Sequence, residues 1–382
     1  MKVLHICSYY IGNKLYMNLV EQLSLLELSQ DVFIPIRSVD EIGKNQLSLE
    51  FNTVNYVYRN IIKRHHKLLF LNKINKQKSE IEQSILLDNI DIIHAHTVFS
   101  DGGTAYQLNK KFGTEYIINV RNTDLNIFYK YGIHLRGFMY KVLLKAKAVI
   151  FISHAYKQKM FSRLPSKIIE KIEKKSYVIP NGIDDEWHEY APVMKEKNSS
   201  ISKKLTLLFI GLLDKNKNLG AVIKSCAKLR EEGYNVNLHV VGNGPMEKRY
   251  ITLCERLKLD SNTVIFHGYE SDKKKIINIM DESDIFVMPS YKETFGIVYI
   301  EAMSRGLPLI YTKNEGIDGF FNNGEVGLPV DPFDINEIVE SIKKIAYKND
   351  EQLSNNCILN AKRFNWRSIA NEYLEIYKNQ VN

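Results

Sequence analysis

Short apolar runs and longer amphipathic segments alternate along the first half of the chain. Apolar, β-branched runs that end in polar or glycine-containing turns are typical of buried strands. They occur at Val3–Cys7, Val32–Ile36, Ile90–Ala95, Tyr116–Val120 and Ala148–Ile152. Residues 15–28 have apolar side chains at three- and four-residue spacing, which predicts a helix between the first two strands. Strands that alternate with helices imply parallel pairing through crossover connections.

The same alternation restarts in the second half. It predicts strands at Leu205–Gly211, Asn237–Val241, Val264–His267, Asp284–Pro289 and Leu307–Tyr311, with a helix at Leu219–Glu231 after the first of them. Residues 190–204 separate the two halves and have the Pro, Ser, Asn and Lys content of a linker. We therefore predict an α/β protein made of two doubly wound, Rossmann-like domains that face each other across a cleft.

Length and composition agree with a two-domain globular protein. The chain has 382 residues, which is long for one domain, and 45% of them are hydrophobic. Its four cysteines lie far apart without C-x-x-C spacing, which indicates a reducing compartment and neither a disulfide scaffold nor a conventional zinc site. The first residues turn polar too soon for a signal peptide, and no stretch approaches the ~20 apolar residues of a membrane-spanning helix. We expect a cytoplasmic protein.

Basic residues are concentrated in the first half. Residues 1–190 hold 26 Lys and Arg against 19 Asp and Glu, whereas residues 191–382 hold 26 against 25. No acidic residue occurs from Leu125 to Ile169, and a second basic block runs from Arg59 to Lys78. This charge could form a solvated surface or attach the protein to an anionic membrane leaflet. Nucleic-acid binding is the weakest interpretation, because no motif of a nucleic-acid-binding fold accompanies the charge.

The strongest chemical signal is the segment Tyr291–Met303. Gly296 is expected to open a helix through Glu301, and a helix N-terminus after a strand suits a diphosphate. Glu293 precedes the helix, so the two carboxylates could bind hydroxyls at two points of an extended ligand. The alternative is a pair of solvated glutamates. It is weakened because the residues between them include the apolar Phe295, Ile297, Val298 and Ile300.

Glu293 and Glu301, with seven residues between them, resemble the E-x7-E signature of glycosyltransferase family 4, whose members are retaining enzymes with the GT-B fold. Further segments resemble motifs of the same family: Val178–Asp184 (P-N-G-V-D), Phe209–Asn218 (G-x-L…K-N/G), Val240–Pro245 (G-x-G-P), Gly324–Pro332 and Phe364–Trp366 (F-x-W). The similarity is specific over residues 178–382 and looser over residues 1–177.

The resemblance implies a role for each matching residue. Glu293 would contact the donor sugar, Glu301 the ribose, and Lys217 the diphosphate, whose charge grows as it leaves. Further donor contacts would come from Gly296, Phe295, Ile297, Val298, Gly211, Gly12 and Asn13. The acceptor would contact His96, Asp124 and Asn181, with Arg121 as a further catalytic residue. No D-x-D motif occurs, which fits a reaction without a metal or other cofactor.

Three positions depart from the family pattern. Gly12 is followed by Asn13 where a second glycine is common, although asparagine adopts the left-handed conformation more readily than most residues. Arg121 occupies the position of a histidine that faces the reacting sugar. It would either take over that contact or bind a charged group on acceptor or donor. Leu212 replaces an arginine, which leaves Lys215 as the nearest cation to assist Lys217.

Two histidines at the end of a predicted strand, His94 and His96, point to the same side. A metal site is not supported, because no cysteine or group of carboxylates lies nearby in the sequence. The family resemblance instead implies that His96 and a turn at Gly102-Gly103 line the acceptor site, with His94 in a structural role.

We expect an acceptor-binding domain over 1–185, a nucleotide-sugar-binding domain over 186–365, and a helix over 366–382 that returns to the first domain. The predicted reaction moves a sugar, with retention, from a nucleotide sugar to a hydroxyl of a lipid-linked or growing surface polysaccharide. UDP is expected from the family's majority. The basic domain would hold the enzyme at the inner face of the cell membrane. The alternatives are a sugar-nucleotide epimerase with the same fold, or a subunit that binds nucleotide sugar without turnover.

Overall fold

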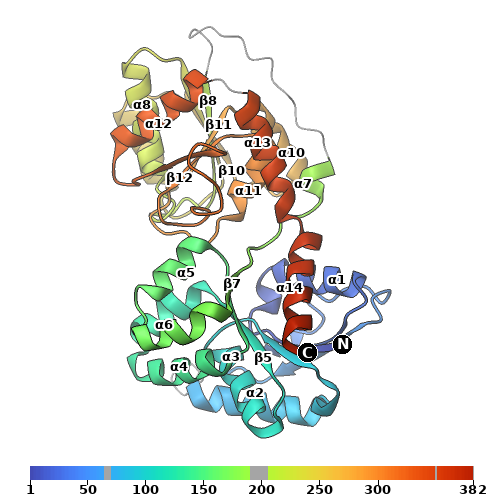
Figure 1. Ribbon diagram of the computed structural model, residues 1–382. Helices are drawn as coiled ribbons and strands as arrows, with labels where there is room; N and C mark the ends of the chain where they lie inside the picture. The colour runs from blue at the N-terminus through green and yellow to red at the C-terminus, as the bar shows by residue number, and fades with distance from the viewer. Residues whose placement is uncertain (64–69, 190–204, 349–350, 382) are drawn as a thin grey trace. The chain divides into compact units, whose positions relative to one another are not determined.

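The computed structural model describes residues 1–63, 70–189, 205–348 and 351–381. The chain divides into two compact units (Figure 1). The first contains Met1–Ile152, Tyr156–Gly182 and the C-terminal segment from Trp366, and the second contains Ser153–Ala155 and Ile183–Asn365. The expected linker at 190–204 and part of the second basic block, 64–69, lie outside the described residues. In the described segments, no helix is long and apolar enough to cross a membrane.

The first unit is built on a seven-stranded parallel sheet with the order β3-β2-β1-β4-β5-β6-β7. Its strands are β1 (Lys2–Ile6), β2 (Ser29–Ile36), β3 (Val54–Asn60), β4 (Ile92–Ala95), β5 (Tyr116–Val120), β6 (Ala148–Phe151) and β7 (Ser176–Val178). The five strands predicted here are confirmed, with ends shifted by up to three residues, whereas β3 and β7 were not predicted.

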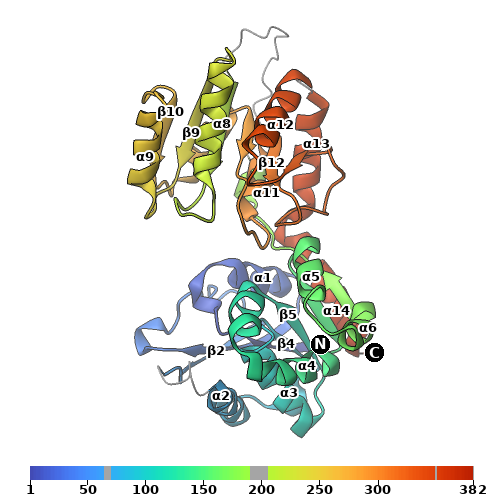
Figure 2. The same ribbon diagram turned by 90° about the vertical axis from the view of Figure 1, so that its left-hand side faces the viewer.

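Helices cover both faces of this sheet (Figures 1 and 2). They are α1 (Leu15–Leu25), α2 (Phe70–Ser84), α3 (Ser100–Phe112), α4 (Arg136–Lys145), α5 (His154–Phe161), α6 (Ser166–Ile172) and α14 (Trp366–Val381). Ile117 of β5 packs in one core cluster with residues of α1 and α14. Its neighbour Ile118 points to the opposite face and meets α3 at Gly102. The C-terminal helix is therefore part of the core of the first unit.

The second unit has a six-stranded parallel sheet with the order β10-β9-β8-β11-β12-β13. The strands are β8 (Leu205–Ile210), β9 (Val236–Val241), β10 (Val264–Gly268), β11 (Ile285–Val287), β12 (Leu309–Thr312) and β13 (Gly327–Val330). The helices are α7 (Glu186–Glu189), α8 (Leu219–Glu231), α9 (Glu247–Arg256), α10 (Lys273–Glu282), α11 (Ile297–Ser304), α12 (Ile335–Lys348) and α13 (Glu351–Ala361). The prediction of two doubly wound α/β sheets is confirmed.

Two of the places where the chain passes from one unit to the other, at residues 182–183 and 365–366, are held by close contacts. The N–H of Ile183 donates to the carbonyl of Phe364 at 2.7 Å, and Ile183 forms a parallel bridge with Asn365. Gly182 lies against Trp366, so that a Cβ atom at Gly182 would stand 2.7 Å from the indole Cδ2 and 2.9 Å from the Trp366 backbone nitrogen. Only glycine fits at this position without displacing the first residue of α14.

We expect Gly182→Ala to lower the free energy of unfolding by about 1 to 3 kcal/mol, because the added methyl group overlaps the backbone of α14. The measurement is urea or thermal unfolding of the whole chain. The matched control is Gly137→Ala in α4, where a Cβ meets no atom within 4 Å and helix propensity favours alanine. If the two variants had the same free energy of unfolding, the contact between residue 182 and Trp366 would not require glycine.

Candidate functional site

The second sheet changes direction between β8 and β11, which are neighbours in the sheet but not in the sequence. From β8 the chain proceeds through β9 to β10 on one side, and from β11 through β12 to β13 on the other. In open parallel sheets, ligands bind beyond the carboxyl ends of the strands at such a switch point. The two loops that begin there, 211–218 and 288–296, contain Lys217 and Glu293.

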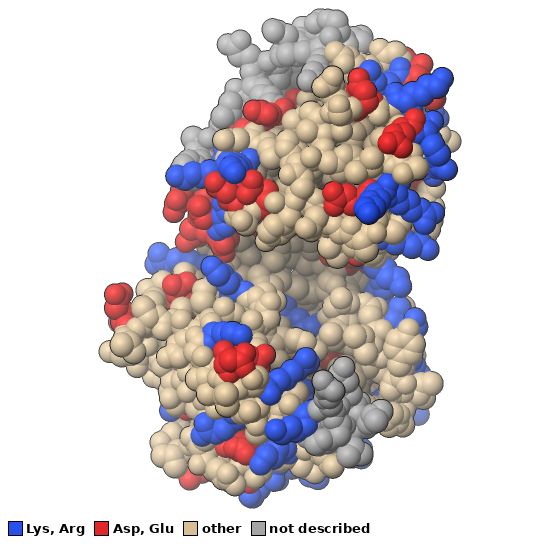
Figure 3. Space-filling model, turned by 180° about the vertical axis from the view of Figure 1, so that it is seen from behind, with Lys and Arg blue, Asp and Glu red and all other residues tan. Residues whose placement is uncertain are grey.

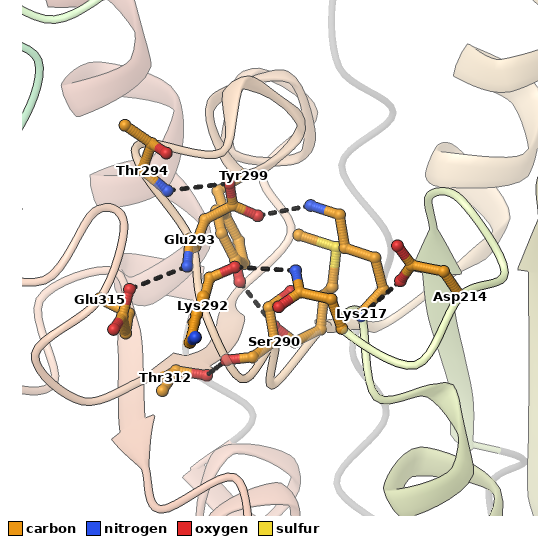
Figure 4. Close-up of polar contacts among 11 residues, drawn as sticks. Asp214, Lys217, Ser290, Lys292, Glu293, Thr294, Tyr299, Thr312 and Glu315 are labelled. Carbon is orange, nitrogen blue, oxygen red and sulfur yellow. Dashed lines mark hydrogen bonds and ion pairs between the residues drawn. The ribbon is translucent and has the colours of Figure 1, made fainter. Parts of the chain in front are cut away.

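Lys217 and Glu293 form an ion pair across this switch point, with 2.5 Å between Nζ and Oε2 (Figure 4). Both side chains are largely buried, with 22% and 13% of their surfaces exposed. The backbone N–H of Glu293 donates to Oε2 of Glu315 at 2.9 Å, and that of Lys217 donates to Oδ1 of Asp214 at the same distance. The structure therefore brings together two predicted site residues that lie 76 positions apart.

Backbone contacts hold the two loops against each other. The side-chain amide of Asn216 donates to the carbonyl of Lys292 at 2.9 Å, and the N–H of Tyr291 donates to the carbonyl of Asn216 at 2.8 Å. Asn218 takes the left-handed conformation, with φ at 59°, and its amide donates to the carbonyls of Pro289 and Pro332. The position of the ion pair is therefore set by hydrogen bonds from the Asn216 and Asn218 side chains to main-chain carbonyls, together with one bond between the main chains of the two loops.

Helix α11 begins directly after this loop, as predicted. Gly296 precedes it with φ at 81°, and a Cβ there would lie 2.5 Å from the ring of Tyr299. The Tyr299 hydroxyl donates to the carbonyl of Met288, the residue that follows β11. The N–H groups of Ile297 and Val298 lie in the first helical turn, where no acceptor exists within the helix. Such a terminus is suited to a phosphate group.

Glu301 lies one turn further along α11, and its carboxyl group has neither a hydrogen bond nor an ion pair with any described residue. Burial, with a contribution from the charge of Asp184, raises the pKa of Glu301 to about 7, and Lys273 opposes the rise. Lys273 is itself paired with Asp184 at 2.6 Å and with Glu186 at 2.8 Å. Glu301 is therefore a partly buried carboxyl that the protein leaves without a partner.

The remaining predicted donor-site residues of the second unit lie along the same edge. The N–H of Gly211 donates to the carbonyl of Val241 at 3.0 Å, so it extends the pairing of β8 with β9. Phe295 is buried before α11. Leu212 and Lys215 are both exposed in the loop after β8. Lys215 forms no ion pair with a described residue, and its role beside Lys217 stays a prediction.

The first sheet has its own switch point, between β1 and β4. Gly12 is exposed in a single 3-10 turn after β1. Asn13 is extended, with φ at −163°, so it does not use the left-handed conformation that asparagine permits, and its role in donor binding stays a prediction. Its side chain instead accepts a hydrogen bond from the N–H of Leu15 at 3.0 Å, which fixes the start of α1. The loop is therefore stabilised by capping the helix.

Gly102 and Gly103 do not form the expected turn. Both are buried inside the first turns of α3, where a Cβ on Gly102 would lie 2.9 Å from the carbonyl of Thr97 and one on Gly103 would lie 2.6 Å from Ile74. The glycine pair thus allows α3 to approach the strand end and α2 closely. The sequence suggested a turn because paired glycines usually mark one.

His94 and His96 are joined by a third buried histidine, His5 of β1, which the sequence analysis missed. The signal was the parallel pairing of β1 with β4, which places His5 opposite His94. The three rings could in principle surround a metal ion. However, both ring nitrogens of His94 are hydrogen-bonded, to the Tyr377 hydroxyl at 2.7 Å and to Oδ1 of Asn119 at 3.0 Å. Burial lowers the pKa of all three, so we describe them as a neutral, hydrogen-bonded cluster.

Arg121 follows β5 and contacts two of the predicted acceptor residues. Its Nη1 donates to Oδ1 of Asn181 at 3.1 Å, and its backbone N–H donates to Oδ2 of Asp124 at 2.9 Å. Oδ1 of Asp124 accepts from the N–H groups of Val98 and Phe99, and burial raises the pKa of this carboxyl to about 7. Asp124 thus connects the loops after β4 and β5. The roles expected for these residues stay predictions.

Known proteins resemble the chain over nearly its whole length. Residues 18–187 match the family Glycosyltransferase Family 4, and residues 192–364 match the family Glycosyl transferases group 1. The capsular polysaccharide biosynthesis glycosyltransferase CapM of Staphylococcus aureus is 30% identical over 57% of this chain and 59% of its own length. N-acetyl-alpha-D-glucosaminyl L-malate synthase of Bacillus anthracis is 25% identical over 76% of this chain and 75% of its own length.

Solved structures show the same fold. Anabaena HepE in complex with UDP superposes with a TM-score of 0.74 at 18% identity, and covers 99% of this chain and 100% of its own. The apo form of the lipopolysaccharide outer core galactosyltransferase WaaB gives 0.75 at 17% identity and covers both chains fully. Together with the two consecutive family matches and the two parallel sheets, these similarities show that the chain is a GT-B-fold enzyme of glycosyltransferase family 4, whose members use nucleotide sugars, retain the anomeric configuration and need no metal ion.

Proposed function

We propose that this enzyme transfers a sugar from a UDP-sugar to a hydroxyl group of a lipid-linked or growing surface polysaccharide. The observation that carries the proposal is the Lys217–Glu293 ion pair, held at the switch point beside the first turn of α11. HepE has been solved with UDP and with UDP-glucose, and CapM acts in capsular polysaccharide biosynthesis. Both relatives support the donor and acceptor classes named here.

In this proposal, the diphosphate binds between Lys217 and the N–H groups of Ile297 and Val298. Cationic and N–H donors that are fixed in advance stabilise the charge that develops on a leaving phosphate. Because Lys217 is already paired with Glu293, donor binding replaces one partner of the lysine with another. Glu293 is then released to accept hydrogen bonds from hydroxyls of the donor sugar. Glu301, which has no partner in the protein, accepts hydrogen bonds from the ribose.

We assign no side chain of this site as a nucleophile, because in this proposal the carboxylate of Glu293 accepts hydrogen bonds from the donor sugar. We therefore favour transfer on the face from which the diphosphate leaves. The leaving phosphate oxygen takes the proton of the acceptor hydroxyl, and that hydroxyl oxygen bonds to the anomeric carbon as the bond to the phosphate breaks. The protein contributes by positioning both substrates and stabilising charge.

Attachment of the first unit to an anionic membrane is supported by its exposed side chains. Six of the nine basic residues between 125 and 169 are exposed: Lys130, Lys141, Lys145, Lys147, Arg163 and Lys167. Three large apolar side chains nearby are more than half exposed, Ile127, Tyr131 and Ile133. On the face that Figure 3 shows, basic side chains are scattered over the lower part of the molecule, and over the upper part as well, and form no single concentrated patch. Diffuse charge with exposed apolar residues suits a lipid surface, which supports our proposal that the enzyme acts at the inner face of the cell membrane.

The donor is tested by a thermal-shift screen against UDP, GDP, ADP and CMP and their common sugars, with and without EDTA. A ligand that binds only the native state raises the melting temperature. We expect a shift with UDP that is larger with one UDP-sugar and unchanged by EDTA. If a different nucleoside diphosphate, and not UDP, gave this shift, that nucleotide would take the place of UDP in the proposal. No shift with any of the nucleotides would contradict the donor site.

Glu301→Gln is the site-specific control for this screen. We expect it to weaken UDP binding by about tenfold at pH 8, because a carboxylate binds hydroxyls more strongly than an amide does. The pKa of Glu301 is raised to about 7, so the carboxylate form is lost as the pH falls from 8 to 6. The advantage of the wild type over Glu301→Gln should therefore decrease over that range, whereas the titration of UDP itself affects both proteins equally.

Glu293→Gln should lower kcat by about 10²- to 10³-fold and change the affinity for UDP only slightly, because Glu293 acts on the sugar and on Lys217 during transfer. The measurement is steady-state transfer with the donor that the screen identifies. Glu255→Gln, an exposed glutamate of α9, is the control and should be unaffected. Unchanged turnover in Glu293→Gln would overturn this assignment.

Vesicle co-sedimentation tests the membrane proposal. We expect the protein to bind vesicles that contain phosphatidylglycerol and to ignore vesicles of phosphatidylcholine alone. Replacing Lys130, Lys141 and Lys145 with Gln should reduce binding at least about tenfold, since each basic residue near such a surface contributes ~1 kcal/mol. The same change at the exposed Lys224, Lys248 and Lys274 of the second unit should have little effect. Equal binding to both lipids would refute the proposal.

A further inference from the structure

Arg121 is a cation without a carboxylate partner. Among the described residues, it forms no ion pair, and its one side-chain hydrogen bond is the donation from Nη1 to the amide oxygen of Asn181 at 3.1 Å. Its Nε is buried and has no hydrogen-bond partner. The guanidinium also lies over the ring of Tyr16, with 5.5 Å between Cζ and the ring centroid. Asn181 and Tyr16 fix the orientation of this charge but do not neutralise it.

Nearby carboxylates are directed elsewhere. Asp124, three residues along the chain, uses both oxygens to accept backbone N–H groups, including that of Arg121 itself. Asp101 accepts hydrogen bonds from the hydroxyl and the N–H of Ser8. A charge that is partly withdrawn from water without an opposite charge is unfavourable. Arg121 is therefore arranged like a residue whose counterion arrives with a ligand.

The free edge of Arg121 has a defined shape. With Nη1 engaged by Asn181, the remaining donors Nε and Nη2 lie side by side and in the plane of the group. This edge matches the two oxygens of a carboxylate or phosphate, which a lysine could not bind in the same manner. A second unpaired polar atom lies close by. Nδ1 of His96 is buried without a partner, and the His96 ring packs on the same Tyr16 ring at 5.0 Å.

We propose that the acceptor site of the first unit binds an oxyanion on the Nε and Nη2 edge of Arg121, so that the enzyme selects acceptors that carry a carboxylate or a phosphate. The selection of acceptors rests on the proposed function, but the binding of the oxyanion does not. It is a property of this chain in particular, because Arg121 replaces the histidine that resemblance to the family leads one to expect.

The test compares methyl β-D-glucuronide with methyl β-D-glucoside, which differ only in the carboxylate. Binding to the whole chain is measured by calorimetry or ligand-observed NMR, with saturating UDP present to occupy the second unit. We expect the glucuronide to bind at least about tenfold more tightly, in line with one charge-assisted pair of hydrogen bonds. Equal affinity of the two glycosides would overturn the proposal.

Three variants assign the preference to Arg121. Arg121→Met should abolish it, and Arg163→Met, an exposed arginine of the same unit, should leave it intact. Asn181→Asp keeps the guanidinium and nearly the same shape, but places a carboxylate on Nη1, so the preference should fall as in Arg121→Met. The thermal shift with UDP shows that each variant is folded. A preference that survives in both Arg121→Met and Asn181→Asp would contradict the proposal.

Two further comparisons show whether the anion belongs to the acceptor or to the donor, and whether a negative result concerns the oxyanion site or the proposed function. UDP-glucuronate and UDP-glucose are compared in the same variants, and a preference for UDP-glucuronate that depends on Arg121 would assign the anion to the donor and overturn the acceptor assignment. If UDP gives no shift in the wild type, the proposed function fails, and the glycoside comparison without UDP still tests the oxyanion site.

Discussion

The reversal of strand order within each parallel sheet is the constraint on which the rest of this structure depends. Parallel strands place all their carboxyl ends at one edge of the sheet. At the reversal, the loops that follow two adjacent strands lead away in opposite directions, which opens a crevice between them. In the second unit that pair is β8 and β11, and the separated loops hold Lys217 and Glu293. In the first unit it is β1 and β4, beside which His96 lies. The candidate site residues named here therefore lie next to the strand pair at which the order of each sheet reverses.

The core strands and the start of α11 could be predicted because their signals are local. β5 and α8 have the predicted ends, and Gly296 precedes α11 as expected. The missed strands lack a strong apolar run. β3 alternates with Asn and Arg, β7 has three residues, and β13 contains Gly327 and Pro329. Each is stabilised by a neighbouring strand, which the sequence of the strand does not describe.

The site was predictable as a set of residue types but not as a set of contacts. Motifs placed a lysine and a glutamate in two loops, yet their ion pair depends on Asn216 and Asn218, whose side chains tie those loops together. His5 was missed because it becomes relevant only through the register of β1 with β4. The turn expected at Gly102 was wrong because the conformational freedom of a glycine does not reveal whether it is used for a turn or for a close approach between elements.

The groups that remain unpaired differ between the two units, and this difference has a physical meaning. In the second unit one such group is the carboxyl of Glu301, whose pKa is raised by burial, and the neighbouring cation Lys273 is already paired with Asp184 and Glu186. In the first unit one such group is the guanidinium of Arg121, while the neighbouring Asp124 accepts hydrogen bonds from backbone N–H groups. A folded chain readily satisfies polar groups with its own partners. The groups that it leaves unsatisfied therefore support the two ligand contacts that we propose, hydroxyl donors at Glu301 and an anion at Arg121.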